Sequence, residues 1–315
     1  MKNIKIIEVP SEIGAGTRGA SLGTEAIKIA ALDFMSNFFV HFPSEKIETE
    51  NHLLFEPIHS PYAKRIGGVL TMYERVSKSV KDSMENNFFP VVISGDHSNA
   101  GGTIAGIKAA KPNSRLGVIW IDAHADLHTP YTTPSGNMHG MPLAASIGED
   151  NTECKVHEPD EKTKKQWDQL KSSGKKEPRV LPENIVFIGL RDFEKEEKHL
   201  IDKYGMKVIT TNEVRRKGPE NVVKASLRFL SECTDIYVSF DVDCLDSSIS
   251  KGTGTPVSNG LKEREAEDLI SKFMQNRKIC CFEITEVNPT LDKENLMAEI
   301  AFNILQRSVN VLMMN

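Results

Sequence analysis

The sequence has few cysteines, little net charge and no long hydrophobic run. Its 315 residues include five cysteines, none of them in a Cys-x-x-Cys pair, and this odd number argues against a disulfide framework. No apolar stretch approaches the ~20 residues that span a bilayer, and the start MKNIKIIEVP has too short an apolar run for a signal peptide. A net charge of -5 gives no electrostatic footprint for nucleic acid. We therefore expect a cytoplasmic protein that binds neither membranes nor nucleic acid.

Short apolar segments rich in Val, Ile and Phe alternate with longer segments of helical period. Several of these segments are apolar at consecutive positions, as a sheet covered on both faces requires. The alternation predicts an α/β fold with a doubly wound parallel sheet. Strands are expected at 5–9, 90–95, 116–122, 184–190, 207–210, 236–241 and 279–287, and helices at 63–87, 99–110, 194–204, 219–231, 262–276 and 293–313.

One stretch interrupts this alternation. Between Glu149 and Arg179, 16 of 31 residues are charged. We interpret it as a charged surface excursion at about 149–183, with one helix around Lys162–Lys171, and not as a second domain. The chain is therefore expected to form one domain over residues 1–315.

Asp and His residues collect directly after the predicted strands. In a parallel sheet these carboxyl ends lie at one edge, where ligands bind. In an extended backbone residues i and i+2 point the same way, so D-x-H-x-D and D-x-D each direct their side chains to one side. The residues at this edge are Asp96, His97, Asp122, His124, Asp126, His128, Asp241, Asp243, Asp246 and Glu286.

This set of side chains suits divalent cations. A single Asp after a strand is usually a helix cap or a turn residue, and His128 and Asp246 alone fit that role. Several carboxylates packed together, however, repel one another unless cations are present. Two imidazoles and four carboxylates exceed the four ligands of a structural zinc. They suit two ions, and the oxygen-rich set favours Mn²⁺, with Co²⁺, Ni²⁺ or Fe²⁺ as alternatives.

The motifs and their order resemble the ureohydrolase family, and most closely the arginases. The match extends from the first strand to the last helix and leaves out only the charged excursion. SGNMHG and EVNP favour arginases over agmatinases. The motifs are GDHS (95–98), DAHADLHTPYTTPSGNMHG (122–140), SFDVDCLD (239–246), GTGTPV (252–257) and EVNPTLD (286–292).

The resemblance implies a three-layer α/β/α fold around a mostly parallel eight-stranded sheet, and homo-oligomers that are trimers or hexamers. It assigns His97, Asp122, Asp126 and Asp241 to one Mn²⁺, and Asp122, His124, Asp241 and Asp243 to the other. It also gives catalytic roles to Asp126, which orients the attacking hydroxide, to His139, which shuttles a proton, and to Glu286, which receives the guanidinium. The substrate-binding set is His128, Ser135, Asn137, Glu194, Glu197 and Thr255.

We therefore expect a metal-dependent hydrolase that cleaves the guanidino group of L-arginine to L-ornithine and urea by attack of a metal-bridging hydroxide. The alternatives are agmatinase, guanidino-acid hydrolase or formimidoylglutamase activity, a related zinc deacetylase, and a regulatory relative without metal. Two positions depart from arginases, because His128 stands where Asn is usual and Glu194 where Asp is usual. Cys244, Cys280 and Cys281 are expected to be buried small hydrophobic residues, not nucleophiles.

Overall fold

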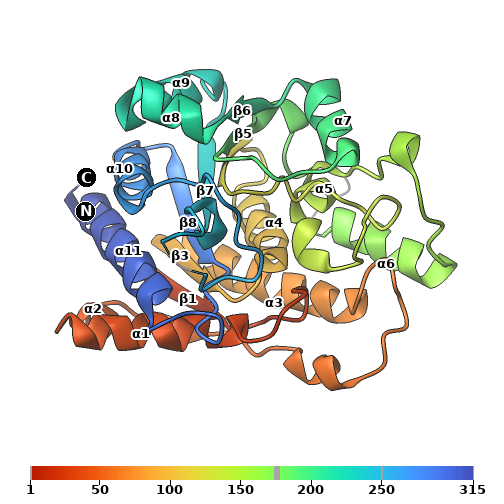
Figure 1. Ribbon diagram of the computed structural model, residues 1–315, viewed down its shortest axis with the longest axis horizontal. Helices are drawn as coiled ribbons and strands as arrows, with labels where there is room; N and C mark the ends of the chain where they lie inside the picture. The colour runs from red at the N-terminus through yellow and green to blue at the C-terminus, as the bar shows by residue number, and fades with distance from the viewer. Residues whose placement is uncertain (1, 174–177, 250, 315) are drawn as a thin grey trace.

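Eight strands form one sheet in the computed structural model, which describes residues 2–173, 178–249 and 251–314 (Figure 1). Every strand pairs in parallel with its neighbours, in the order β2-β1-β3-β8-β7-β4-β5-β6. The four central strands are therefore β3, β8, β7 and β4. The strands are β1 (Asn3–Val9), β2 (Ser44–Lys46), β3 (Phe88–Ser94), β4 (Leu116–Ile121), β5 (Ile185–Ile188), β6 (Lys207–Ile209), β7 (Asp235–Asp241) and β8 (Ile279–Thr285).

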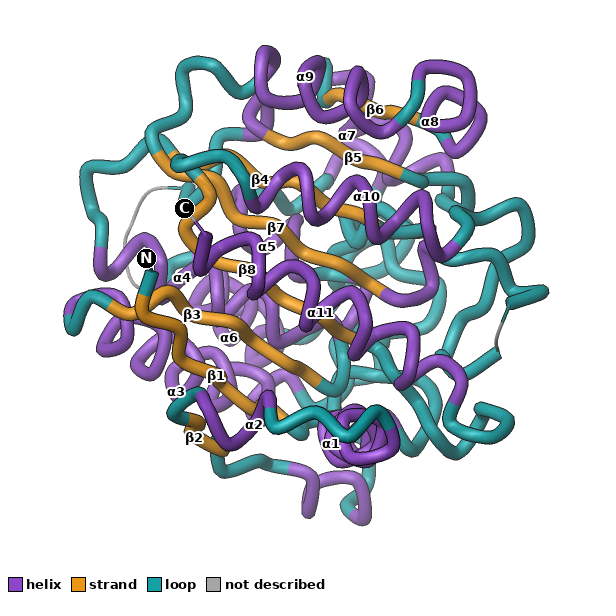
Figure 2. Tube along the Cα trace, turned by 90° about the vertical axis from the view of Figure 1, so that its left-hand side faces the viewer, coloured by secondary structure: helices purple, strands orange, loops and turns teal. Residues whose placement is uncertain are grey.

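Helices cover both faces of the sheet, and Figure 2 shows α10 and α11 crossing one face while α4 and α6 lie behind the other. No helix within the described residues is long and apolar enough to cross a bilayer. The first layer contains α1 (Gly23–Asp33), α9 (Pro219–Phe229), α10 (Glu263–Met274) and α11 (Leu296–Met314), and the second contains α3 (Ile66–Glu85), α4 (Ala100–Ala110), α5 (Pro142–Ile147), α6 (Glu161–Lys171) and α7 (Lys195–Tyr204). The remaining α-helices are α2 (Phe38–His41) and α8 (Thr211–Lys217).

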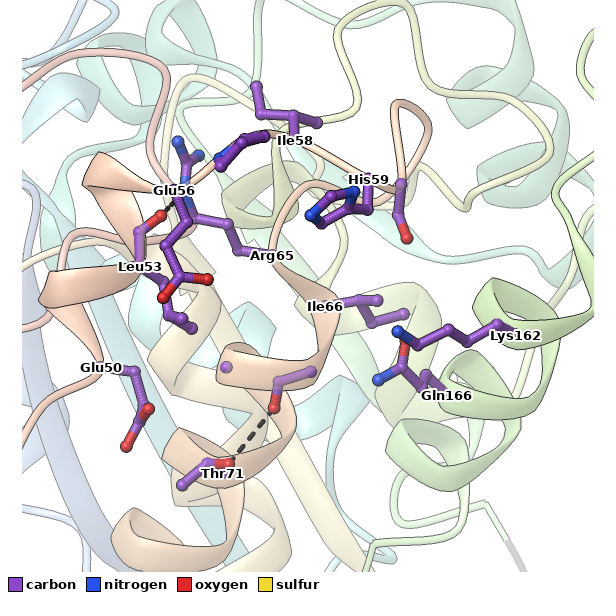
Figure 3. A pocket seen from close by; sticks show the side chains of 14 residues that line it. Glu50, Leu53, Glu56, Ile58, His59, Arg65, Ile66, Thr71, Lys162 and Gln166 are labelled. Atoms are coloured by element: carbon purple, nitrogen blue, oxygen red, sulfur yellow. Dashed lines mark hydrogen bonds between the residues drawn. The ribbon is translucent and has the colours of Figure 1, made fainter.

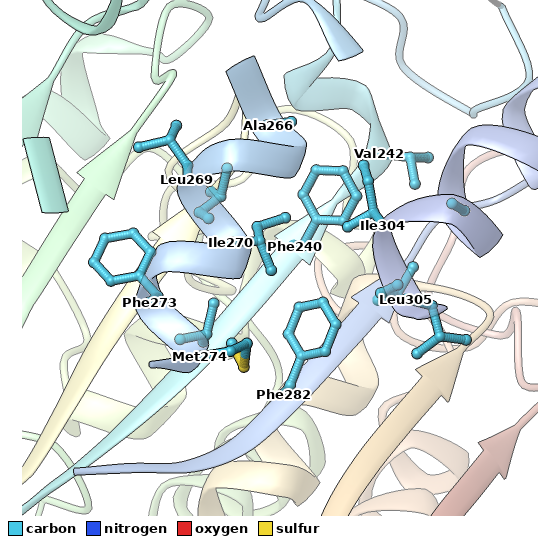
Figure 4. Close-up of a cluster of buried hydrophobic side chains, with 14 of the residues drawn as sticks. Phe240, Val242, Ala266, Leu269, Ile270, Phe273, Met274, Phe282, Ile304 and Leu305 are labelled. Carbon is cyan, nitrogen blue, oxygen red and sulfur yellow. The ribbon is translucent and has the colours of Figure 1, made fainter. Parts of the chain in front are cut away.

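Two hydrophobic clusters, one on each face, hold the three layers together. In the first cluster, Phe240 of β7 and Phe282 of β8 project toward Ile270 of α10 and Leu305 of α11 (Figure 4). All four side chains are buried. Burying a side chain of this size stabilises the fold by about 1.5–3 kcal/mol relative to exposure, so the strands are fixed firmly beneath the loops at their carboxyl ends.

The predicted fold class is confirmed, and each predicted strand and helix has a counterpart in the structure. Strand β2 was not predicted because it has only three residues, Ser44–Lys46, none of which is buried. Four α-helices were not predicted either. Helices α2, α5 and α8 have only four to seven residues, which carry too little periodicity, and α1, with eleven residues, lies outside all the predicted helix ranges.

The charged excursion contains the expected helix, α6, but it is packed more tightly than a surface excursion. Trp167 and Leu170 of α6 are buried in the second hydrophobic cluster. The Trp167 indole donates to Asp150 Oδ1 at 2.8 Å, and Lys171 Nζ donates to the same oxygen at 2.6 Å. Most charged residues of α6 are exposed, as expected, but its two apolar residues, three positions apart on one helical face, pack against the core. Residues 174–177 of this stretch lie outside the described residues.

We predict that Phe282→Ala destabilises the protein by about 3–5 kcal/mol, because truncation of a buried Phe leaves a cavity. Urea unfolding followed by circular dichroism would measure this change. Phe55→Ala is the matched control: the Phe55 side chain is 93% exposed, so its truncation should change stability by less than about 0.5 kcal/mol. Equal losses for the two variants would contradict the assignment of this core.

Candidate metal centre and active site

The loops that follow the four central strands meet at one edge of the sheet. They carry His97 after β3, Glu286 after β8, Asp241 and Asp243 at the end of β7, and Asp122 after β4. A cavity of about 320 Å³ opens among these loops. It is lined by His97, His124, Asp126, His128, Thr133, Pro134, Ser135, Asn137, His139, Gly140, Asp192, Glu194, Glu197, Asp241, Asp243 and Thr255.

The first group of candidate metal ligands surrounds His97. Its Nδ1 lies 3.0 Å from Asp122 Oδ2, 3.0 Å from Asp126 Oδ2 and 3.1 Å from Asp241 Oδ2. The other ring nitrogen, Nε2, lies 2.8 Å from Ser239 Oγ, and the imidazole stacks on the indole of Trp120 with 4.0 Å between ring centroids. The contacts with Ser239 and Trp120 therefore fix the orientation of the ring, with Nδ1 facing three carboxylates.

The second group shares Asp122 with the first. His124 Nδ1 lies 3.0 Å from Asp243 Oδ2 and 3.5 Å from Asp122 Oδ1. Asp122, His124 and Asp243 offer ligand atoms close enough together to hold one ion, as do His97, Asp122 and Asp126. Thr255 donates its hydroxyl hydrogen to Asp243 Oδ2 at 2.9 Å, so this predicted substrate-binding residue contacts a candidate ligand.

The backbone brings these side chains together in a way that differs from the expected extended chain. Asp122 begins a bend directly after β4, and Asp126 has a left-handed conformation with φ 52°. Asp241 ends β7, and its carboxylate accepts the backbone N–H of Asp243 at 2.8 Å, which caps a short 3-10 helix at Val242–Cys244. The side chains therefore converge through turns and not through strand alternation.

The donor set fits divalent cations. Asp122, Asp126, Asp241 and Asp243 are all buried. Burial, together with the charge of Asp122, raises the pKa of the Asp126 carboxyl to about 6, and burial with the charge of Asp243 raises the pKa of Asp241 well above its usual range. His97 Nδ1 and Asp122 Oδ2 are buried atoms that make no hydrogen bond of proper geometry. Positive charge among these atoms would relieve both the repulsion and the missing partners.

His139 and Glu286 form a second functional pair. His139 Nδ1 lies 3.0 Å from Glu286 Oε1, which also accepts the backbone N–H of His97 at 3.0 Å. Burial opposes protonation of His139, but the hydrogen bond to Glu286 and its charge outweigh burial and raise the pKa of His139 to about 9. Glu286 itself has a left-handed backbone, with φ 66°. Such strained residues are typical of active sites.

The predicted amino-acid end of the cavity contains a charged cluster. His128 Nε2 lies 3.0 Å from Glu194 Oε2 and 3.6 Å from Glu197 Oε2, and His128 Nδ1 lies 3.2 Å from Thr132 Oγ1. The hydrogen bond from His128 lowers the pKa of Glu194 to about 2, whereas burial raises the pKa of Glu197 to about 8. These three side chains are also close enough together for a cation.

Ser135 and Asn137 also line the cavity, and Ser135 Oγ accepts the backbone N–H of Asn137 at 3.1 Å. The structure thus brings together every predicted site residue. It adds Asp192, whose carboxylate lies 3.7 Å from His124 Nε2 and which was not among the predicted residues. Asp246, in contrast, accepts N–H groups of Ser248 and Gly260 in a turn, as expected for a capping residue.

The cysteines near these strands are structural. Cys244, Cys280 and Cys281 are buried, and burial raises the pKa of the Cys280 thiol to about 12. Because a nucleophilic cysteine needs a lowered pKa, the expectation of buried small residues is confirmed.

Comparison with known proteins shows the family of this chain. The family model "Arginase family" matches residues 2–309. This chain belongs to the arginase family. It is 37% identical to an arginase of Brevibacillus brevis, with 96% of each chain covered. It is also similar to the crystal structure of Bacillus subtilis arginase, at 34% identity, a TM-score of 0.80 and 98% coverage of each chain. The crystal structure of Entamoeba histolytica arginase in complex with L-ornithine has 28% identity, a TM-score of 0.82 and 99% coverage of each chain.

Membership of the arginase family confirms the resemblance that the motifs indicated.

A second cavity, of about 310 Å³, lies between the segment before α3 and helix α6 (Figure 3). Its lining includes Glu50, His59, Arg65 and Lys162 but no candidate ligand and no residue of the cavity described above. The second cavity therefore contributes no residue to either group of candidate ligands.

We predict that Asp241→Asn weakens cation binding in both groups, because its carboxylate contacts His97 and also caps the turn that carries Asp243. Elemental analysis after dialysis should find about two Mn²⁺ per chain in the wild-type protein and well under two in the variant. Asp246→Asn, which follows the same strand but lies outside both groups, is the control and should retain its metal. Two ions in Asp241→Asn would show that this carboxylate is not a ligand.

Proposed function

We propose that this protein hydrolyses the guanidino group of L-arginine to L-ornithine and urea. The observation that carries the proposal is the complete set of six His and Asp residues, gathered at one edge of the sheet beside the His139–Glu286 pair. The similarity to arginases over nearly the whole chain supports the same activity.

His97, Asp122, Asp126 and Asp241 would hold one cation, and Asp122, His124, Asp241 and Asp243 the other. Mn²⁺ is the proposed metal because carboxylate oxygens outnumber imidazoles. When bound, two such cations would lower the pKa of bound water and so supply a nucleophile near neutral pH. Asp126, which has a left-handed backbone and whose Oδ2 lies 3.0 Å from His97 Nδ1 at the cavity, would accept a hydrogen bond from that water and orient it.

Glu286 and His139 would act on the substrate. The Glu286 carboxylate binds the planar guanidinium by charge-assisted hydrogen bonds, which fixes its carbon for attack. Departure of ornithine requires a proton on the leaving amine. His139 is placed to supply it, because Glu286 lies 3.0 Å from its Nδ1 and keeps the imidazole protonated.

The amino-acid end of the substrate would meet His128, Ser135, Asn137, Glu194 and Glu197. Both ring nitrogens of His128 already have partners, Thr132 and Glu194. A substrate carboxylate that binds His128 must therefore displace the Glu194 carboxylate, which costs binding energy. We infer that this end of the site binds arginine more weakly than a site with Asn at position 128 and Asp at position 194.

A urea-release assay with arginine, agmatine and 4-guanidinobutyrate, after reconstitution with Mn²⁺, tests the proposal directly. Arginine should be the preferred substrate. A preference of at least tenfold for either of the other two compounds would overturn it in favour of another ureohydrolase activity.

We also propose that the protein is a cytoplasmic homo-oligomer, a trimer or hexamer, which sedimentation analysis can test.

We predict that His139→Ala lowers kcat by roughly 10²–10⁴-fold, the usual contribution of general acid–base catalysis. The Mn²⁺ content should stay unchanged, because His139 contacts Glu286 and not the ligand carboxylates. Parallel kinetics and elemental analysis would measure both. An unchanged kcat would show that the proton comes from another group.

We predict that the double variant His128→Asn with Glu194→Asp has a lower KM for arginine and a kcat within a few-fold of wild type. The change removes the ion pair that competes with the substrate carboxylate, and an effect on KM alone is the pattern of uniform binding. Agmatine lacks that carboxylate, so the single change His128→Asn should leave its KM unaltered. A raised KM for arginine in the double variant would contradict the competition.

A further inference from the structure

The segment Ser60–Arg65, which precedes helix α3, runs directly alongside the loop that carries Ser135 and Asn137. The backbone N–H of Lys64 donates to the carbonyl of Gly136 at 2.8 Å. Gly136 has φ +75°, and a Cβ at this position would lie 1.8 Å from the carbonyl oxygen of Pro61. Only glycine permits this approach, so the two segments are held in one register.

Within this segment, Lys64 alone reaches toward the active site. Its Nζ donates to Asn137 Oδ1 at 3.0 Å, in a partly buried contact. The next residue, Arg65, has a left-handed backbone with φ 58°, and its Nε donates in another direction, to the carbonyl of Leu53 at 2.9 Å (Figure 3). Lys64 does not line the cavity, but Asn137 does. The ammonium group therefore lies one side chain away from the space that a substrate would occupy.

The charged excursion fixes the position of this segment. The Tyr62 ring stacks on His157 with 4.1 Å between centroids, and His157 Nε2 lies 2.7 Å from the carbonyl oxygen of Thr133, in the loop that contains Asn137. Thr163 of α6 donates its hydroxyl hydrogen to Ser60 Oγ at 3.0 Å. Contacts at Ser60 and Tyr62 therefore help to hold the segment, and with it Lys64, beside Asn137.

The charge of the residues that line the cavity makes the Lys64 ammonium group significant. Among the described residues, the lining contains no lysine or arginine, and its amino-acid end carries Asp192, Glu194 and Glu197. The one histidine there, His128, is engaged by Glu194. A substrate carboxylate that enters this end meets like charges, so a cation close behind the lining would favour its binding.

Lys64 can supply that charge through Asn137. A charged donor on the amide oxygen fixes the orientation of the amide and polarises it, so that the Nδ2 hydrogens become stronger donors. Residue 16 is glycine, and its lack of a side chain leaves room beside Asn137 Nδ2. A Cβ at this position would lie only 2.6 Å from that nitrogen. The amide can therefore present N–H groups to a carboxylate, with the ammonium directly behind it.

We propose that Lys64 is a positioning residue for the α-carboxylate of the substrate: it acts through Asn137 and favours substrates that carry this group over those that lack it. This inference rests on the proposed hydrolysis of arginine and names a further residue that selects the substrate.

The test compares Lys64→Met, which keeps most of the length of the side chain and removes its charge, with wild type in the Mn²⁺-loaded enzyme. We expect the KM for L-arginine to rise about five- to thirty-fold, the loss of one charge-assisted contact, with kcat within about twofold. Binding of L-ornithine, measured by calorimetry, should weaken by the same factor. The KM for agmatine, which has no carboxylate, should stay constant, and Lys64→Arg should recover most of the affinity for arginine.

Lys162→Met is the matched control. Lys162 is exposed on α6 and lines the second cavity (Figure 3), so its removal lowers the charge of the same region without touching Asn137 and should leave all constants unchanged. Equal changes for arginine and agmatine in Lys64→Met, or no change for either, would overturn the role of Lys64 while arginine hydrolysis by the wild-type enzyme stands. A wild-type enzyme that cleaves agmatine and neither cleaves arginine nor binds ornithine would overturn both proposals.

Discussion

Four carboxylates, those of Asp122, Asp126, Asp241 and Asp243, lie buried within one small space at the carboxyl edge of the sheet. Like charges in a buried setting repel strongly, and proteins tolerate them when cations are bound or protons are taken up. Burial and repulsion between these carboxylates raise the pKa values of Asp126 and Asp241. Cation binding would therefore do more than supply chemistry, because it would stabilise the loops that carry these residues.

The rigid sheet allows the loops to adopt conformations that would otherwise be unfavourable. Asp126 and Glu286 both have positive φ without being glycine, which costs on the order of 1–3 kcal/mol each. Hydrogen bonds hold them in place: the Asp126 carbonyl accepts the N–H of Leu143 at 3.2 Å, and the N–H of Glu286 donates to the Gly95 carbonyl at 2.9 Å. Both residues that orient water and substrate in the proposed reaction thus have strained backbones.

Much of the fold and of the candidate site could be predicted from sequence, because the signals are local. Strands such as Leu116–Ile121 are apolar at every buried position, and the Asp and His residues that follow them are a few positions apart. The edge strand Ser44–Lys46 lacks such a signal because it is short and polar. The contact between Lys64 and Asn137 joins residues 73 positions apart, and nothing in either local sequence indicates it. Asp126 was placed correctly, but from an extended geometry that the chain does not adopt.

The stacking of His97 on Trp120 has a consequence for how this protein can be observed. The two rings are almost parallel, with an interplanar angle of 5°, and the indole is buried against an imidazole that faces three carboxylates. The sequence contains two tryptophans, and the other, Trp167, lies in α6. The emission of Trp120 therefore originates beside the candidate metal centre, so Trp120 fluorescence is an intrinsic probe of changes at that edge of the sheet.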